Sequence, residues 1–130
     1  MDKNTKILIV DDFPTVRNII KSVLNHLGYE SLLEAEDGNS ALPILRRENI
    51  GFVVTDWKMP GMEGIDLLKI IRQYSNHTEL PVLMVTAESE DAQKREALNA
   101  GANAILFKPF TPKQLERSIL DIFSQLEAAA

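Results

Sequence analysis

The sequence predicts an α/β fold in which five parallel strands alternate with five helices to form a doubly wound sheet. Two observations support this prediction. Short apolar runs rich in β-branched residues alternate along the chain with segments whose apolar residues recur at helical spacing. The strand-like runs are also almost continuously apolar, which is typical of strands whose two faces are both covered by helices.

The first strand and the first helix follow from short-range signals. We expect a strand over residues 6–10 and a helix over residues 14–28. Pro14 suits the first helical turn, and Gly28 suits the C-terminal exit. The apolar residues expected to face the core are Val16, Ile19, Ile20, Val23, Leu24 and Leu27.

The next four elements alternate in the same way. We expect strands over residues 31–35 and 51–56 and helices over residues 38–49 and 64–74. Pro43 must remove a backbone hydrogen bond or kink the first of these helices unless the helix begins after it. The second of these helices is expected to turn three residues inward, Ile65, Leu68 and Ile71.

The last four elements complete the alternation. Residues 80–87 form an apolar run that predicts a strand covered on both faces, and residues 103–108 predict the fifth strand. Helices are expected over residues 89–101 and 111–126. The closing helix has a strong apolar stripe, which consists of Leu115, Ile119, Ile122 and Leu126.

Composition and charge restrict the function classes. With 130 residues, of which 45% are hydrophobic and 25% charged, the chain fits one soluble domain covering residues 1–130. No apolar run approaches the roughly 18 residues of a membrane span. The absence of cysteines and of a secretory signal fits a cytoplasmic location. A net charge of −5 without a stripe of Lys and Arg argues against nucleic-acid binding and favours proteins or cations as partners.

Polar side chains end the predicted strands, at the edge where doubly wound sheets bind their ligands. Asp11 and Asp12 follow the first strand, and Asp56 ends the third. Thr86 ends the fourth strand and Lys108 the fifth. Each residue alone has a simple structural explanation, such as a helix cap or an ordinary strand end. Three carboxylates, a hydroxyl and an ammonium around one crevice together predict a functional site.

These side chains point to one kind of chemistry. Crowded carboxylates repel one another, so we expect a hard cation, and Mg²⁺ prefers one or two carboxylates together with water and phosphate oxygens. When Mg²⁺ and Lys108 neutralise the three acids, the site can accept a phosphoryl group. An aspartate can act as the nucleophile towards phosphorus. Thr86 can donate a hydrogen bond to a phosphoryl oxygen.

Five stretches carry a specific pattern, namely ILIVDDFPTVRNII, EAEDGNSAL, VVTDWKMPGMEGIDLL, LPVLMVTA and GANAILFKPF. They span nearly the whole chain and resemble the receiver domain of bacterial two-component response regulators, in particular the single-domain chemotaxis type. The resemblance implies a flavodoxin-like sheet with strand order 2-1-3-4-5. It also implies a switch that receives its phosphoryl group from a histidine kinase and catalyses only its own phosphorylation and dephosphorylation.

The same resemblance implies roles for individual residues. Asp56 is the expected phosphoacceptor, and Asp12 and Asp56 are the expected direct ligands of Mg²⁺. Asp11 is expected to act largely through metal-bound water, and the backbone carbonyl of Lys58 to complete the protein ligands. A cis peptide bond is implied for Lys108–Pro109.

Output is expected through protein binding. The chain ends soon after the fifth helix, so we expect no effector domain, and a monomer that binds a flagellar motor switch protein or another protein target, with a phosphatase as a further candidate partner. Two features depart from the motor-binding type. Ile105 stands where such relatives usually carry Tyr or Phe, and Glu88, Glu90 and Asp91 make the start of the fourth helix acidic. The acidic run also suits a solvated first helical turn.

Other functions are compatible with parts of this pattern. A non-motor phosphate sink or a phosphorelay shuttle would use the same site. An aspartate-nucleophile phosphatase would need an acid where the chain has Lys58, and a flavodoxin-like electron carrier would need a neutral loop where it has Asp11 and Asp12. We also hypothesise that Lys58 and Glu88 pair across the mouth of the site and limit the access of water to the aspartyl phosphate.

Overall fold

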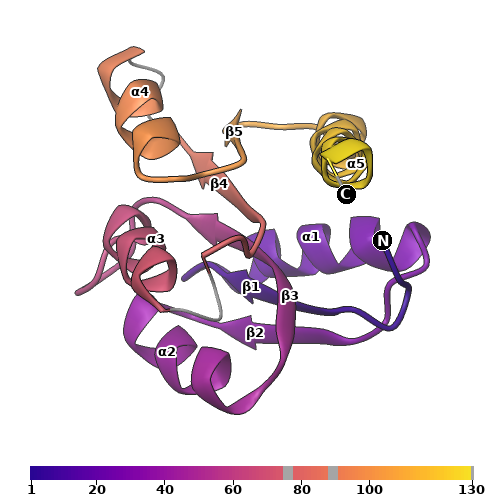
Figure 1. The fold of residues 1–130 in the computed structure, drawn as a ribbon, viewed down its shortest axis with the longest axis horizontal. Helices are drawn as coiled ribbons and strands as arrows, with labels where there is room; N and C mark the ends of the chain where they lie inside the picture. The colour runs from indigo at the N-terminus through magenta and orange to yellow at the C-terminus, as the bar shows by residue number, and fades with distance from the viewer. Residues whose placement is uncertain (75–77, 88–90, 130) are drawn as a thin grey trace.

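Five parallel strands form one sheet in the order β2-β1-β3-β4-β5 in the computed structural model (Figure 1). The structure describes residues 1–74, 78–87 and 91–129. This order confirms the predicted 2-1-3-4-5 arrangement. The direction in which successive strands are added reverses between the central strands β1 and β3, and such sheets bind ligands at that point. The strands are β1 (Lys6–Val10), β2 (Leu32–Ala35), β3 (Ile50–Asp56), β4 (Val82–Thr86) and β5 (Ala104–Phe107).

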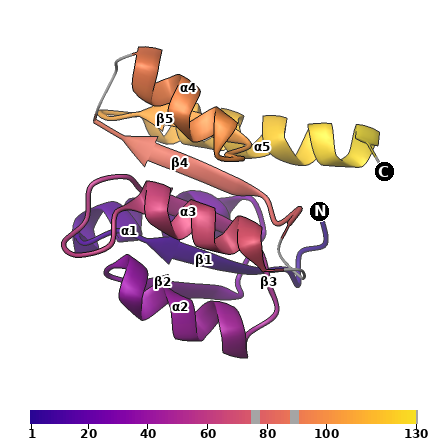
Figure 2. The same ribbon diagram turned by 60° about the vertical axis from the view of Figure 1, so that its left-hand side comes forward.

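Helices cover both faces of the sheet, as Figures 1 and 2 show. One face packs against α1 and α5, and the other packs against α2, α3 and α4. No helix in the described part of the chain is long and apolar enough to cross a membrane. The helices are α1 (Pro14–His26), α2 (Gly38–Arg47), α3 (Gly64–Gln73), α4 (Asp91–Asn99) and α5 (Pro112–Ala129).

The central strands are buried on both faces because their side chains alternate between two apolar clusters. Ile7 and Ile9 of β1 belong to the cluster beneath α1 and α5. Leu8 and Val10 belong to the cluster beneath α2, α3 and α4. The prediction of nearly continuous apolar strands is therefore confirmed, and burial of this kind holds the ends of the strands in fixed positions.

One local prediction differs from the structure, and one alternative that the sequence leaves open is decided. Ile19 was expected in the core but is 39% exposed, because it lies at the edge of the apolar stripe of α1, whose centre is filled by Ile20, Val23 and Leu24. Pro43 lies in the interior of α2, so that helix does not begin after it. Pro43 has no N–H, and α2 lacks one internal hydrogen bond as a result.

The remaining helix boundaries agree with the sequence to within a few residues. Asp37 caps α2, with its Oδ1 accepting a hydrogen bond of 2.7 Å from the backbone N–H of Ser40. Gly28 follows α1 with a φ of 99°, a conformation that favours glycine. The expected start of the fourth helix at Ser89 lies outside the described residues, which resume at Asp91.

Candidate functional site

The ends of the strands place the predicted site residues at one edge of the sheet. Asp56 is the last residue of β3, and Thr86 is the last residue of β4. The backbone N–H of Asp11, directly after β1, donates to the carbonyl of Ala35 at 3.1 Å. The N–H of Lys108, directly after β5, donates to the carbonyl of Thr86 at 2.7 Å. Backbone hydrogen bonds therefore extend the sheet to the residues that carry the chemistry.

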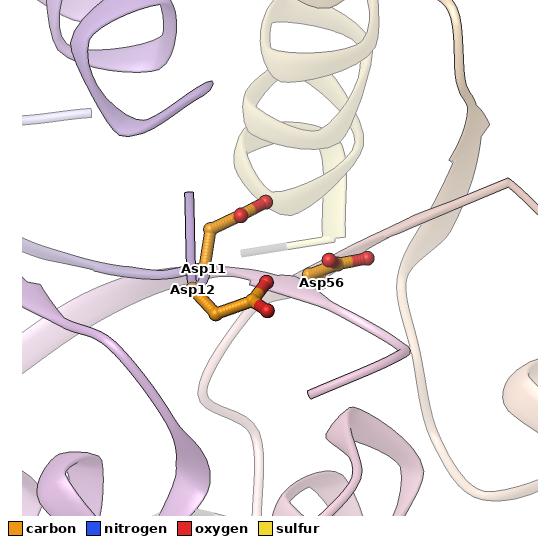
Figure 3. Close-up of side chains that lie close together, drawn as sticks. All are labelled: Asp11, Asp12 and Asp56. Carbon is orange, nitrogen blue, oxygen red and sulfur yellow. The ribbon is translucent and has the colours of Figure 1, made fainter. Parts of the chain in front are cut away.

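The charged side chains of this edge converge on one another. The Nζ atom of Lys108 lies 3.1 Å from Oδ2 of Asp56 and 3.2 Å from Oδ2 of Asp11. Carboxylate oxygens of Asp11, Asp12 and Asp56 all lie within 4.8 Å of one another (Figure 3). Asp11 and Asp56 are only 1% and 5% exposed, so this charge is held away from bulk water. The convergence predicted from the sequence is confirmed for these four residues.

The hydrogen bonds of the three carboxylates are unequal. Asp11 Oδ1 accepts from the N–H of Phe13 at 2.9 Å, and Asp56 Oδ1 accepts from the N–H of Trp57 at 2.8 Å. Asp12 Oδ1 is buried and has no hydrogen-bond partner within the described residues. A buried carboxylate oxygen without a donor requires a cation or water. The three acids therefore fit a hard divalent cation, as the sequence predicts.

Burial and charge shift the ionisation of the central pair. Burial raises the pKa of Asp56, the Lys108 ammonium opposes this shift, and the neighbouring Asp11 carboxylate adds to it. For Lys108, burial acts to lower the pKa, but the attraction of Asp56 and Asp11 outweighs it, and the pKa of Lys108 is raised. Lys108 therefore keeps its positive charge at neutral pH and compensates the acids around it.

A glycine allows the loop after Asp56 to fold closely over the strand end. A Cβ atom at Gly64 would lie 2.0 Å from the backbone oxygen of Asp56 and 3.0 Å from Cα of Trp57. The N–H of Gly64 donates to the carbonyl of Trp57 at 2.7 Å. The start of α3 is thus packed directly against the backbone of Asp56, which leaves no room for a side chain at Gly64.

Three further predictions concern residues around this centre. Thr86 is buried at the end of β4, and the use of its hydroxyl as a hydrogen-bond donor to a phosphoryl group stays a prediction. The peptide bond of Lys108–Pro109 is cis, as the family resemblance implies. Lys58 is exposed in the loop after Asp56, and the use of its carbonyl as a metal ligand stays a prediction.

Four residues are expected to distinguish this chain from motor-binding relatives, and two of them lie within the described part of the chain. Glu88 and Glu90 lie outside the described residues, and so does the hypothesised pair of Lys58 with Glu88. Asp91 is exposed at the first described position of α4. Ile105 is half-buried in β5 and packs against the apolar cluster beneath α2, α3 and α4.

Sequence reasoning missed a group of charged residues beside the acidic cluster. Nη1 of Arg17 donates to the backbone carbonyl of Asp11 at 2.5 Å, and its Nε donates to Glu34 Oε1 at 2.9 Å. Lys21 Nζ lies 2.9 Å from Glu34 Oε2. Two signals were available, since Arg17 and Lys21 are four residues apart on α1 and Glu34 interrupts the otherwise apolar strand β2.

Comparisons with known proteins agree with this geometry. Residues 7–120 match the response regulator receiver domain family. The chain is 52% identical over 126 residues to the chemotaxis protein CheY-3 of Vibrio cholerae, covering 97% of each chain. It is also 52% identical over 121 residues to the chemotaxis protein CheY of Pseudomonas aeruginosa, covering 93% of this chain and 98% of that protein. The solved structure of the chemotaxis response regulator CheY4 of Vibrio cholerae superposes with a TM-score of 0.85 at 32% identity, covering 92% of this chain and 98% of that one.

Proposed function

The chain belongs to the response regulator receiver domain family, and from this premise we propose that it is a phosphorylation-activated switch of chemotaxis whose phosphoacceptor is Asp56. The observation that carries the proposal is the position of Asp56. It ends a central buried strand, lies 3.1 Å from the Lys108 ammonium and stands beside two further carboxylates. We propose that the receiver domain comprises residues 1–130, of which residues 7–120 match the family.

The proposed donor is a phosphohistidine of a histidine kinase. An Asp56 carboxylate oxygen forms a bond to phosphorus, the phosphorus–nitrogen bond of the donor breaks, and the imidazole leaves with the electron pair and takes up a proton. Lys108 compensates negative charge on the transferred group, and Thr86 donates a hydrogen bond to one of its oxygens. Water later attacks phosphorus and restores Asp56, so the chain acts as a switch that modifies only itself.

The same proposal assigns Mg²⁺ to the acidic cluster. Asp12 and Asp56 would be direct ligands, Asp11 would act through water, and the carbonyl of Lys58 would complete the protein ligands. The unpartnered Oδ1 of Asp12 supports this assignment. When bound, Mg²⁺ supplies positive charge that neutralises the transferred phosphoryl group. The residues themselves hold that cation beside the nucleophile and exclude bulk water.

Output would occur in the cytoplasm, through binding of the phosphorylated monomer to a protein target such as a flagellar motor switch protein. A phosphatase is a further proposed partner. Ile105 favours a second candidate, a non-motor phosphate sink or phosphorelay shuttle. The half-buried Ile105 side chain has no aromatic ring that could turn inward when the protein is phosphorylated. Side-by-side titration of a flagellar switch peptide with the phosphorylated protein and with an authentic motor regulator distinguishes the two. Equal affinity supports the motor, and much weaker binding supports the sink or shuttle.

Intact-mass measurement tests the phosphorylation itself. The protein is incubated with acetyl phosphate, a small acyl-phosphate donor, with Mg²⁺ and with EDTA in its place. We expect one added phosphoryl group with Mg²⁺ and little or none with EDTA. Asp56→Ala should gain none, whereas the matched variant Asp66→Ala, which removes an exposed carboxylate on α3, should behave as the wild type. Full phosphorylation of Asp56→Ala would refute the proposal.

A further inference from the structure

Arg17 connects three elements beside the acidic cluster. It lies on α1, its Nη1 donates to the carbonyl of Asp11 at the end of β1, and its Nε donates to Glu34 Oε1 on β2. The Arg17 side chain is only 16% exposed. The second carboxylate oxygen of Glu34, Oε2, lies 2.9 Å from Nζ of Lys21. The guanidinium is thus fixed at two points, an arrangement for which its planar fork is suited.

The carbonyl that Arg17 contacts belongs to the peptide group joining Asp11 to Asp12. The orientation of that peptide group determines the directions in which the two acidic side chains leave the backbone. Asp11 has additional restraints, since Phe13 and Lys108 each donate to its carboxylate. Asp12 Oδ1 has no hydrogen-bond partner within the described residues. The position of the Asp12 carboxylate therefore depends mainly on the backbone.

We propose that Arg17 is a positioning residue for the cation site: together with Glu34 it fixes the Asp11–Asp12 peptide group and so directs the Asp12 carboxylate towards the cation. This inference rests on the proposed function, because it takes the acidic cluster to bind Mg²⁺. Glu34 serves the arrangement in two ways. It orients the guanidinium, and it compensates a positive charge that would otherwise repel a nearby divalent cation.

Positioning and simple electrostatics predict opposite results when Arg17 is changed. If its charge alone mattered, removing a cation close to the metal site would tighten Mg²⁺ binding. If positioning dominates, removal weakens binding because Asp12 loses its fixed direction. Residues that orient metal ligands typically contribute about 10-fold to 100-fold in affinity. The sign of the change therefore separates the two explanations.

The experiment measures Mg²⁺ affinity by calorimetry and by emission of Trp57, whose backbone N–H contacts Asp56. We expect Arg17→Met to bind Mg²⁺ about tenfold more weakly than the wild type. Lys21→Met is the matched control, because it removes a positive charge from the same Glu34 carboxylate without touching Asp11. Its affinity should be unchanged or slightly higher.

A conservative variant separates the shape of Arg17 from its charge. Arg17→Lys keeps the charge but loses the fork that reaches Asp11 and Glu34 together, so its affinity should also fall, by severalfold. If Arg17→Met does not fold, as judged by urea unfolding, Arg17→Lys still decides the question. Wild-type affinity in Arg17→Lys, tighter binding in Arg17→Met, or an equal loss in Lys21→Met would overturn the inference. A wild-type protein that binds no Mg²⁺ would overturn the metal assignment as well.

Discussion

The two halves of the sheet differ in how tightly they are packed. In the half that carries Asp56, every residue of β4 is buried and α3 buries most of one face. In the other half, all residues of β5 are only half-buried, and α4 buries Ala97 alone among its described residues. Figure 1 shows α4, β5 and α5 together on one side of the molecule, next to β4.

This difference fits the different demands on the two halves. Phosphoryl transfer needs a nucleophile and a cation site held in fixed positions, and strands buried on both faces provide this. Segments with few buried apolar contacts change conformation at lower cost. Thr86 lies in register with Phe107, and Met84 lies in register with Ile105. A change at the proposed phosphoryl site is therefore one strand away from the less buried half. We therefore expect phosphorylation to alter β5 and α4 more than β1 and β3.

The largest expected effect comes from adding a side chain beside the end of β3. Gly64→Ala would place Cβ 2.0 Å from the backbone oxygen of Asp56, so the backbone must move, and we expect a loss of about 4 kcal/mol in the free energy of unfolding. Gly38→Ala is the control at the first residue of α2, where the flexible Met62 side chain can move instead. Urea unfolding measures both losses. Similar small losses would show that the Asp56 end of β3 is not tightly packed.

Matched leucine truncations compare the two halves directly. Leu83→Ala in fully buried β4 should cost about 3 kcal/mol of unfolding free energy. Leu106→Ala in half-buried β5 removes the same atoms and should cost about half as much, because less of that side chain is withdrawn from water. If urea unfolding shows equal losses of free energy for the two variants, the two halves of the sheet do not differ in packing as proposed.

Mg²⁺ affinity tests the proposed roles of the two acids beside Asp56. Asp12→Asn should weaken Mg²⁺ binding by at least about tenfold, because its carboxylate is a proposed direct ligand. Asp11→Asn should weaken it less, since Asp11 is proposed to act through metal-bound water and not as a direct ligand. Titration of Trp57 emission with Mg²⁺ gives both affinities. Identical losses would reject this division between the two acids.

The smallest expected effect is a pH dependence at the edge of the sheet. Hydrogen bonds from Lys21 and then Arg17 lower the pKa of Glu34 below its ordinary value of 4.5, against the opposing effect of burial. A lowered pKa stabilises the fold above the ordinary value, and this contribution is lost as pH falls through the lowered value. Glu34 is exposed and screened, so the contribution is on the order of 0.5 kcal/mol.

Unfolding measured against pH tests this contribution. Glu34→Gln should reduce the stability at neutral pH and flatten its decline in acid. The control Asp121→Asn removes a more exposed partner, which lies 3.8 Å from Arg117 on α5, and should change stability less. If the stability of Glu34→Gln depends on pH in the same way as that of the wild type, these ion pairs do not stabilise the fold.

The sequence predicts most of the fold and the acidic site because both depend on local patterns. Asp11, Asp56, Thr86 and Lys108 end strands that apolar runs identify, and parallel strands bring their carboxyl ends to one edge. The strand order and the cis bond at Pro109 came from the family resemblance, since neither leaves a periodic signal. The absence of a tyrosine or phenylalanine at position 105 is also visible only against that resemblance.

The sequence predicts less where contacts join distant elements. The bridge from Arg17 to the carbonyl of Asp11 and to Glu34 depends on the distance between α1 and β2, which no periodicity reports. Ile19 fits the helical stripe of α1, but it lies at the edge of that stripe and is partly exposed. The sequence leaves open whether α2 begins before or after Pro43, and the structure places Pro43 inside the helix.

Locating the phosphoryl group in the wild-type chain tests most directly whether Asp56 is the phosphoacceptor. After incubation with acetyl phosphate and Mg²⁺, the protein is digested with pepsin in acid, and the fragments are sequenced by mass spectrometry. We expect one phosphoryl group, on Asp56 at the end of β3, and none on the neighbouring acids Asp11 and Asp12. A phosphoryl group on either of those acids, or on a residue outside this cluster, would contradict this assignment.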